Sequence, residues 1–481
     1  MTVAQVAALA SPELILALSA LILLVWGAFQ GRINTAFSFA AVVALIAAAV
    51  AAAVGPLGRA FGGGLIADAG SAFTKVVIYL ASAVAIPLGD RWFARRGIEK
   101  FEYPILVIIA ALGMGMMASA GDLISLYISI ELQSLALYIL AAFYRDDVKA
   151  SEAGLKYFVL GALSSGLLLY GASLIYGFAG STRFDAIAHA VQVGAMHGGG
   201  GTGVLFGLIF LICGIAFKVS AAPFHMWTPD VYEGAPTPVV GFFAGAPKLA
   251  AMVLLARVLT ESFGGAIHEW RQILVALALI SVAVGAFAGL VQRNLKRLWA
   301  YSSIASIGYA LVGLAAGGVV GIQAMLIFMV LYVVDVTGFF ACLAALSREG
   351  RPMETMDDFA GLVRERPALG MAMTIFAISA LGIPGFSNFW GKYYVFKAAL
   401  VQGLAPVAVI ALVGSVVAAF YYLKLVKVMW FDPSPGVTDA PPREAALVTY
   451  ATAFFAFPAV LVALIAIDPL AHTAALALAQ R

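Results

Sequence analysis

The sequence contains few charged residues. Asp, Glu, Lys and Arg make up 11% of its 481 residues, whereas a soluble globular domain has about 25%. Hydrophobic residues make up 63% and the mean hydropathy is +1.01, so no stretch carries the polar surface of a soluble domain. The composition also excludes a disordered chain, and a formal net charge of +3 gives no basic surface for nucleic acid. We therefore expect an all-α polytopic membrane protein.

Cysteines and cofactor-binding motifs are also scarce. Cys213 and Cys342 both lie inside apolar runs, so neither a disulfide framework nor a CxxC metal or redox site is available. The sequence has no Gly-rich phosphate loop, H-E-x-x-H motif or dinucleotide fingerprint. Its many glycines lie inside apolar runs, where close helix packing explains them. We expect no cofactor and no metal in this chain.

Long apolar runs dominate what is present. Because a hydrocarbon core about 30 Å thick needs roughly 20 apolar residues per helix, the sequence predicts about fourteen spans. No basic segment precedes the first run, which is therefore read as a retained span and not as a signal peptide. The predicted spans are 13–29, 36–54, 72–89, 104–120, 122–143, 154–178, 204–222, 238–258, 272–291, 298–318, 321–346, 370–400, 404–429 and 446–467.

The loops between these spans differ in basic charge. Alternating sides collect 16 and 5 Lys and Arg residues, with Arg32 on the richer side and Arg257 and Arg481 on the poorer one. The positive-inside rule makes the richer side cytoplasmic and places both termini outside. Residues 180–203 are expected to form an interfacial segment with a Gly-rich tether on the outer face. The polar cytoplasmic loop 347–367 is either a docking surface for a partner or a solvated connection.

The loop tally includes Arg257 and Lys427, which lie at the ends of their predicted spans. The Lys and Arg residues that remain within the spans are seven lysines and no arginine. A desolvated lysine can release its proton whereas arginine effectively cannot, and a buried charge costs at least a few kcal/mol. Lysines near span ends are expected to snorkel to the interface; they are Lys75, Lys397 and Lys424. Lys156 is ambiguous by position. Lys248 lies roughly 15 Å into its span, and Glu131 is at a similar depth, so snorkelling does not explain either.

Lys218 and Lys392 each lie beside a proline. Lys218 precedes Pro223 by five residues, and Lys392 follows Pro384 by eight. A proline removes a backbone hydrogen bond from a helix, and such a break persists in a membrane only where protein or a water-filled cavity satisfies the freed groups. Each break is therefore either a functional site or a structural kink with an incidental lysine.

The positions of these breaks suggest an internal repeat. If spans four to eight and nine to thirteen are two five-helix units, the broken helix is the fourth of each unit, and the second unit is inverted. The sequence then divides into 1–103 with three spans, 104–260 and 261–430 as inverted repeats, and 431–481 with the last span.

One glutamate and several lysines on separate helices fit neither a metal site nor a nucleophilic triad. Proton relay fits, because burial and a nearby carboxylate shift the protonation of a lysine in opposite directions. His225 follows Lys218 by seven residues. It either extends the relay or holds the non-helical joint by hydrogen bonds.

Four stretches then suggest a family. They are ISIELQSLALYIL around Glu131, EAGLKYFVLGALSSGLLLYG around Lys156, FKVSAAPFHMWTPDVYEGAPTPVVGFFAGAPK over 217–248, and FWGKYYVF around Lys392. They resemble the antiporter-like membrane subunits of respiratory complex I, in the form of subunit N of bacterial NADH:quinone oxidoreductase. The matches occur in the expected order over roughly residues 104–430, and the fourteen-span count agrees.

The resemblance implies a role for each site residue. Glu131 would pair with Lys218 and modulate it, Lys248 would be the central relay lysine, and Lys392 would be the terminal one. Lys156 would be an auxiliary charge near the first unit. A lysine at 392 favours subunit N or L over M, and the chain lacks the long lateral helix expected of subunit L.

One acid departs from the family pattern. Asp335 lies in the predicted span 321–346, where an uncharged residue is expected. It is either a member of the proton pathway or a partner for a snorkelling lysine. The sequence around Lys392, GIPGFSNFWGKYY, also differs from the usual family sequence before this lysine, so the local shape of the helix break is left open.

The resemblance also implies a function and a setting. The chain would be a proton-translocating subunit in the bacterial inner membrane, with both termini periplasmic. NADH, FMN, iron–sulfur clusters and quinone would bind in partner subunits. An alternative is a subunit of a multi-subunit cation/proton antiporter, which would use the same lysines without a redox partner. A purely structural subunit with vestigial lysines is a third reading.

Overall fold

The computed structural model describes residues 1–30, 35–197 and 200–479 of the chain. Within these residues, thirteen helices are long and apolar enough to cross a membrane. The described residues are mostly helical, as predicted, and the strands among them form two short hairpins. Some predicted features lie outside the described residues, namely Arg32 and Arg481 in the charge tally and Gly198 and Gly199 in the tether.

The long helices follow the predicted spans closely. In the first part they are α2 (Ser11–Gln30), α3 (Thr35–Val54), α4 (Ala69–Ala94), α5 (Glu102–Ser119), α6 (Leu123–Ala141), α7 (Val148–Ala179), α9 (Gly200–Val219) and α11 (Thr237–Glu261). In the second part they are α12 (Ile267–Gly289), α13 (Leu295–Ala316), α14 (Gly318–Ala345), α18 (Ala405–Phe431), and α19 (Arg443–Phe454) joined through a π-helical turn, Phe455–Ala459, to α20 (Val460–Ala479).

Shorter elements connect them. The short helices are α1 (Val3–Leu9), α8 (Phe184–His197), α10 (Trp227–Gly234) and α15 (Leu362–Glu365), with 3-10 turns at Phe61–Gly63, Gly264–Ala266 and Met356–Phe359. The hairpins pair β1 (Gly58–Ala60) with β2 (Leu65–Ala67), and β3 (Ser347–Arg348) with β4 (Arg351–Pro352). The predicted interfacial segment thus contains a helix, α8, and the polar loop contains β3, β4 and α15.

The predicted span 370–400 is interrupted. It consists of α16 (Pro367–Leu381) and α17 (Ser387–Val401), with a non-helical joint at 382–386 that contains Pro384. A straight helix over those residues would have been too long for the bilayer, and the break resolves this. The two half-helices together with the thirteen long helices account for the fourteen predicted spans.

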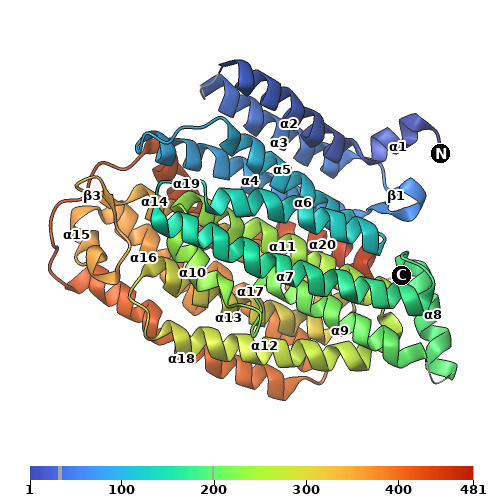
Figure 1. Cartoon of the computed structure of the whole chain (residues 1–481). Coiled ribbons are helices and arrows are strands. Elements are labelled where there is room, and N and C mark those ends of the chain that lie inside the picture. The colour runs from blue at the N-terminus through green and yellow to red at the C-terminus, as the bar shows by residue number, and fades with distance from the viewer. Residues whose placement is uncertain (31–34, 198–199, 480–481) are drawn as a thin grey trace.

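The helices run side by side, and their ends form two faces. Figure 1 shows the N-terminus, α8 and the C-terminal end of α20 at one end of the array, and β3 and α15 at the other. The predicted outer segment and the predicted cytoplasmic loop therefore lie at opposite ends.

The centre of the array is α11. Its residues are buried along the whole helix except for Thr260, which is partly buried. It is covered by α14, α4, α5 and α9, which surround it in the array. A helix that is apolar all round has this position in a bundle.

Glycines let neighbouring helices approach closely. A Cβ on Gly285 of α12 would lie 2.5 Å from the carbonyl oxygen of Tyr301 on α13, and one on Gly171 of α7 would lie 2.7 Å from the carbonyl oxygen of Gly207 on α9. Such backbone contact is how membrane helices gain dispersion energy in a solvent as apolar as their own side chains. The expectation that the glycines serve packing holds at these positions.

Two cations differ from their predicted positions. Arg257, counted as an outer-loop residue, lies inside α11, is fully buried, and bonds Asp68 at 2.9 Å and Glu261 at 2.6 Å. Lys75, expected to snorkel, is 2% exposed and pairs with Glu13 at 2.5 Å. Both expectations were wrong, because each cation has a buried carboxylate partner on another helix or one turn away.

The buried Arg257 pairs should matter for stability. Arg257→Met leaves two buried carboxylates without their cation, and breaking a buried pair in this way costs about 3–5 kcal/mol. We expect less protein in the membrane and a lower melting temperature of the purified assembly. Arg59→Met is the control, because that arginine is 40% exposed and 3.5 Å from Asp185. Equal melting temperatures for the two variants would contradict a stabilising role.

Candidate functional site

Three buried lysines define the candidate site. Lys218 on α9, Lys248 on α11 and Lys392 on α17 are 5%, 1% and 8% exposed. We call their surroundings the first, central and terminal sites. Burial to this degree means that each ammonium group depends on protein atoms for its hydrogen bonds.

At the first site, hydroxyl groups of α6 bind the lysine. Lys218 Nζ donates to Ser134 Oγ at 2.8 Å and to Tyr138 OH at 3.2 Å. Glu131, one turn before Ser134 on the same helix, accepts a hydrogen bond from Ser165 of α7. No direct Glu131–Lys218 ion pair occurs among the described residues, and Ser134 lies between them along α6. The predicted pairing is thus indirect in this structure.

The joint between α9 and α10 lies beside Lys218. Its backbone is held by the Ala222 N–H, which donates to Ser281 Oγ at 2.8 Å, and by Trp227 Nε1, which donates to the Phe217 carbonyl at 3.0 Å. Pro223 is exposed in this joint and His225 is half-buried. Within the described residues no hydrogen bond joins the His225 ring to a site lysine. No direct contact therefore supports a relay role for His225, which was one of the two roles considered.

The central site gathers residues from four helices. Lys248 Nζ donates to Ser303 Oγ of α13 at 2.5 Å, and Ser303 Oγ is 2.5 Å from Tyr332 OH of α14. Tyr332 OH donates in turn to the Ala244 carbonyl at 3.1 Å, on the helix of Lys248 itself. The ring of Tyr232, from α10, lies 5.4 Å from Lys248 Nζ. The ammonium therefore donates to one hydroxyl, which is itself bonded to a second, and it faces an aromatic ring.

A row of aromatic rings runs from the first site to the central site. The ring centroids of Tyr138 and Tyr157 are 4.7 Å apart, and Tyr157 stacks on Trp227 at 4.3 Å. Trp227 then meets Tyr232 at 6.5 Å, beside Lys248. The tyrosine hydroxyls along this row can donate and accept hydrogen bonds in a region that is otherwise apolar.

Polar groups also continue from the central site towards the terminal one. Ser302 is adjacent to Ser303 on α13, and its Oγ is 2.5 Å from Tyr422 OH of α18. Two turns further along α13, the ring of Tyr309 lies 5.0 Å from Lys392 Nζ. One helix, α13, therefore presents side chains to both sites.

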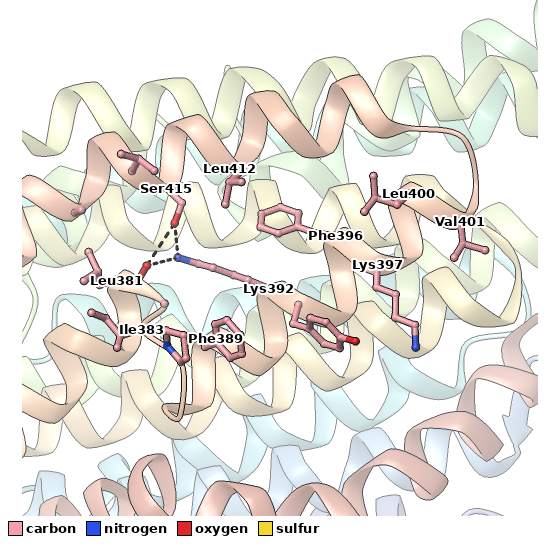
Figure 2. A pocket seen from close by; sticks show the side chains of 15 residues that line it. Leu381, Ile383, Phe389, Lys392, Phe396, Lys397, Leu400, Val401, Leu412 and Ser415 are labelled. Atoms are coloured by element: carbon pink, nitrogen blue, oxygen red, sulfur yellow. Dashed lines mark hydrogen bonds between the residues drawn. The ribbon is translucent and has the colours of Figure 1, made fainter.

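The terminal site uses the broken helix. Lys392 Nζ donates to the Ala380 carbonyl at 3.0 Å. It also donates to the Leu381 carbonyl at 3.1 Å and to Ser415 Oγ of α18 at 2.7 Å (Figure 2). These carbonyls belong to the last turn of α16, where no intrahelical partner is available. The negative end of a helix dipole also favours a cation there. The break thus supplies the ligands for the lysine.

A groove opens beside the terminal site. Its volume is about 740 Å³, and its walls come mainly from apolar residues of α17 and α18 (Figure 2). The polar side chains that line it are those of Lys392, Tyr393, Lys397 and Ser415. Lys397 and Lys424 are exposed, unlike the three site lysines.

Lys156 lies in a separate charged cluster. Its Nζ is 2.8 Å from Asp230 and 2.7 Å from Glu152, and its side chain is 41% exposed. Arg297 of α13 bonds Asp230 at 2.6 Å and Glu233 at 3.2 Å. Burial opposes ionisation of Asp230, but the bonds from Lys156 and Arg297 outweigh it and lower the pKa of that carboxyl. Lys156 thus acts on α10, the short helix after the first break, and touches no site lysine.

Asp335 lies within a long helix, as predicted, but its partners were not predicted. It is buried on α14 and accepts hydrogen bonds from Ser379, Ser387 and Asn388. Among the described residues it pairs with no lysine, so it is not the partner of a snorkelling one. Ser379, Ser387 and Asn388 flank Pro384 in the sequence, and these polar residues could have indicated that Asp335 has neutral partners. No group of His, Cys, Asp and Glu that could hold a metal ion occurs in the described residues.

Comparison with known proteins identifies the family. Residues 120–418 match the family described as "NADH:quinone oxidoreductase/Mrp antiporter, TM". NADH-quinone oxidoreductase subunit N of Caulobacter sp. (strain K31) is 67% identical over 480 residues, which is 99% of each chain. The subunit N of Parvibaculum lavamentivorans is 48% identical over 94% of this chain and 95% of its own.

Solved structures share the fold. A chain of respiratory complex I from Thermus thermophilus with bound aureothin has a TM-score of 0.80 at 34% identity, covering 96% of this chain and 99% of its own. A chain of an archaeal membrane-bound sulfane sulfur reductase has a TM-score of 0.84 at 26% identity, covering 99% and 98%. A chain of the Mrp complex from Dietzia sp. has 0.83 at 21% identity, covering 99% and 98%, and shows the fold alone.

These findings confirm the resemblance drawn from the four motifs. The family match covers the first, central and terminal sites and both helix breaks. The two subunit N relatives match this chain over nearly its whole length, and the match is therefore not limited to one segment. The chain therefore belongs to the NADH:quinone oxidoreductase/Mrp antiporter transmembrane family, among the subunits N of NADH-quinone oxidoreductase.

Proposed function

We propose that this chain is a proton-translocating membrane subunit of an NADH:quinone oxidoreductase. The observation that carries this proposal is the set of three buried lysines on separate helices, joined by aromatic and hydroxyl side chains. The 67% identity to a subunit N over nearly the whole chain supports the redox setting. The alternative, a subunit of a cation/proton antiporter, is supported by the similarity in fold to the chain of the Mrp complex.

The site residues have distinct roles in this proposal. Lys218, Lys248 and Lys392 carry the proton in turn, and Glu131 modulates Lys218 electrostatically across Ser134. Hydroxyl partners suit this chemistry, because a serine or tyrosine hydroxyl donates to a neutral amine as readily as it accepts from an ammonium. Lys156 is an auxiliary charge that positions α10 through Asp230. His225 has the role of holding the joint beside Pro223.

The two helix breaks support the division into inverted repeats. One break follows Lys218 and contains Pro223, and the other precedes Lys392 and contains Pro384. Residues 104–260 and 261–430 would be the repeats, with 1–103 and 431–481 outside them. Paired interrupted helices in such repeats mark transport sites in membrane proteins.

The orientation proposed is that of an inner-membrane protein with periplasmic termini. Both ends of the chain lie at one end of the helix array, opposite β3 and α15 (Figure 1). In the sequence tally, the side that includes the loop 347–367 carries most of the loop Lys and Arg, and removing the buried Arg257 from the other side makes the bias larger.

The redox chemistry belongs to partners in this proposal. NADH, FMN, iron–sulfur clusters and quinone would bind in other subunits, and this chain would receive an electrostatic or conformational signal from them. It would take up protons from the cytoplasm and release them outside. The proposal needs no cofactor on this chain.

Removing Lys248 or Glu131 should sharply reduce pumping. We expect Lys248→Ala to lower NADH-driven proton pumping roughly tenfold or more in assembled complex, because a proton-transfer group contributes on the order of 10²–10⁴ in rate. We expect Glu131→Ala to lower it as well, because Lys218 then loses the charge that modulates it. The measurement is acidification of inverted membrane vesicles, followed with a pH-sensitive dye. Lys424→Ala, which removes an exposed lysine from the next-to-last span, is the matched control. Normal pumping in both Lys248→Ala and Glu131→Ala would contradict the relay assignment.

Lys248→Arg separates proton transfer from fixed charge. Arginine keeps the positive charge but does not release its proton in proteins. We therefore expect pumping to be lost as severely as in Lys248→Ala, with assembly on a native gel unchanged. Lys397→Arg provides the control for the substitution itself, since Lys397 is exposed. Pumping at the unmodified rate in Lys248→Arg would mean that the residue acts only as a charge.

The redox setting can be tested directly. Extraction in mild detergent and a native gel stained for NADH dehydrogenase activity should place the chain in a large assembly that oxidises NADH. Migration in a smaller particle without redox activity would favour the antiporter alternative, and cation-dependent proton flux in liposomes would then be the next assay.

A further inference from the structure

Asp335 has an unusual set of partners for an acid within a membrane. It is 5% exposed on α14. Its carboxylate accepts hydrogen bonds from Ser379 Oγ at 2.5 Å, Ser387 Oγ at 2.6 Å and Asn388 Nδ2 at 2.8 Å. All three donors are neutral, so the carboxylate is satisfied without a cation in direct contact.

These donors come from both sides of the second helix break. Ser379 belongs to the last turn of α16, and Ser387 and Asn388 are the first two residues of α17. The two sides are also joined directly, because the Asn388 N–H donates to Ser379 Oγ at 3.1 Å and the two serine hydroxyls are 2.8 Å apart. The Asp335 carboxylate thus fastens the two half-helices to α14.

The charges at this break match the helix ends. The N-terminus of α17 carries a partial positive charge, and Asp335 lies against it through Ser387 and Asn388. The C-terminus of α16 carries a partial negative charge, and the Lys392 ammonium lies against its carbonyls. One buried anion and one buried cation therefore stabilise opposite sides of a single interruption.

A short path connects the two charged groups. Ser379, which bonds Asp335, directly precedes Ala380, whose carbonyl accepts from Lys392 Nζ at 3.0 Å. The last turn of α16 is thus held from one side by the acid and presents its carbonyls to the lysine on the other. The first break differs, because a neutral hydroxyl, Ser281, holds its backbone.

We propose that Asp335 is a positioning residue for proton transfer at Lys392. Its ionised carboxylate fixes the end of α16, so that the carbonyls of Ala380 and Leu381 remain directed at the ammonium group. It also places a negative charge across the break from that group. Asp335 acts through Ser379 and α16, without contact to the moving proton. The inference rests on the proposed function.

Two substitutions of Asp335 separate charge from shape. Asp335→Asn keeps the shape and an acceptor oxygen but removes the charge, whereas Asp335→Glu keeps the charge on a longer side chain. We expect protons pumped per NADH to fall roughly fivefold in the Asn variant, since charge-assisted hydrogen bonds are about twice as strong as neutral ones. The Glu variant should retain more pumping than the Asn variant. Asp90→Asn, which alters a half-buried acid on α4, is the control.

A double variant tests whether Asp335 acts through Lys392. Asp335→Asn combined with Lys392→Ala should pump no less than Lys392→Ala alone, because the group being positioned is already gone. Three results would each overturn the inference. They are normal pumping in Asp335→Asn, higher pumping in Asp335→Asn than in Asp335→Glu, and lower pumping in the double variant than in Lys392→Ala. If Lys392→Ala itself pumps normally, the relay of the proposed function fails, and the inference fails with it.

A milder change covers the case in which Asp335→Asn does not assemble. Ser387→Ala removes one donor to the carboxylate and leaves the buried charge in place. We expect it to assemble and to reduce pumping less than Asp335→Asn would, by roughly twofold. Unchanged pumping in Ser387→Ala, with assembly confirmed on a native gel, would then count against the inference.

Discussion

The three site lysines are held by neutral oxygens. Lys218, Lys248 and Lys392 donate to serine and tyrosine hydroxyls and to backbone carbonyls, and no carboxylate in the described part of the chain lies within ion-pair distance of them. The buried Arg257 and Lys75 are bonded directly to carboxylates. A direct carboxylate stabilises the charged form and retains the proton, whereas a hydroxyl serves both protonation states. The choice of partner thus separates the lysines of the site from the cations that hold the fold together.

The helix breaks follow from the same requirement. The carbonyls of a continuous membrane helix already accept a hydrogen bond from the next turn, whereas those of the last turn do not. Ending α16 at Leu381 frees two carbonyls for Lys392, and the cost of the interruption is offset by bonds from α14 and α18. At the first break the joint is held by Ser281 and by the Trp227 indole. Both interruptions therefore persist because surrounding helices satisfy them.

Depth and proline position were enough to find the site lysines from the sequence. Lys248 was singled out because no snorkelling path exists from the middle of a span, and Lys392 because of Pro384. The partners could not be found in this way, since Ser303, Ser415 and Tyr332 are far from these lysines in the chain. Arg257 was counted with the outer loop because it lies next to the last residue of the predicted span 238–258, whereas α11 continues to Glu261 and buries it. Lys75 was misread because its partner Glu13 lies two helices earlier.

The burial of α11 has a consequence for the membrane as an insulator. Neither lipid nor water reaches Lys248 except through the side chains of the helices around it. A membrane that stores a proton gradient is short-circuited by any open water path across it. In the proposed relay, a proton would pass the enclosed central lysine only when neighbouring hydroxyls and rings rearrange. The same packing that isolates α11 would then keep the gradient from leaking back through the subunit.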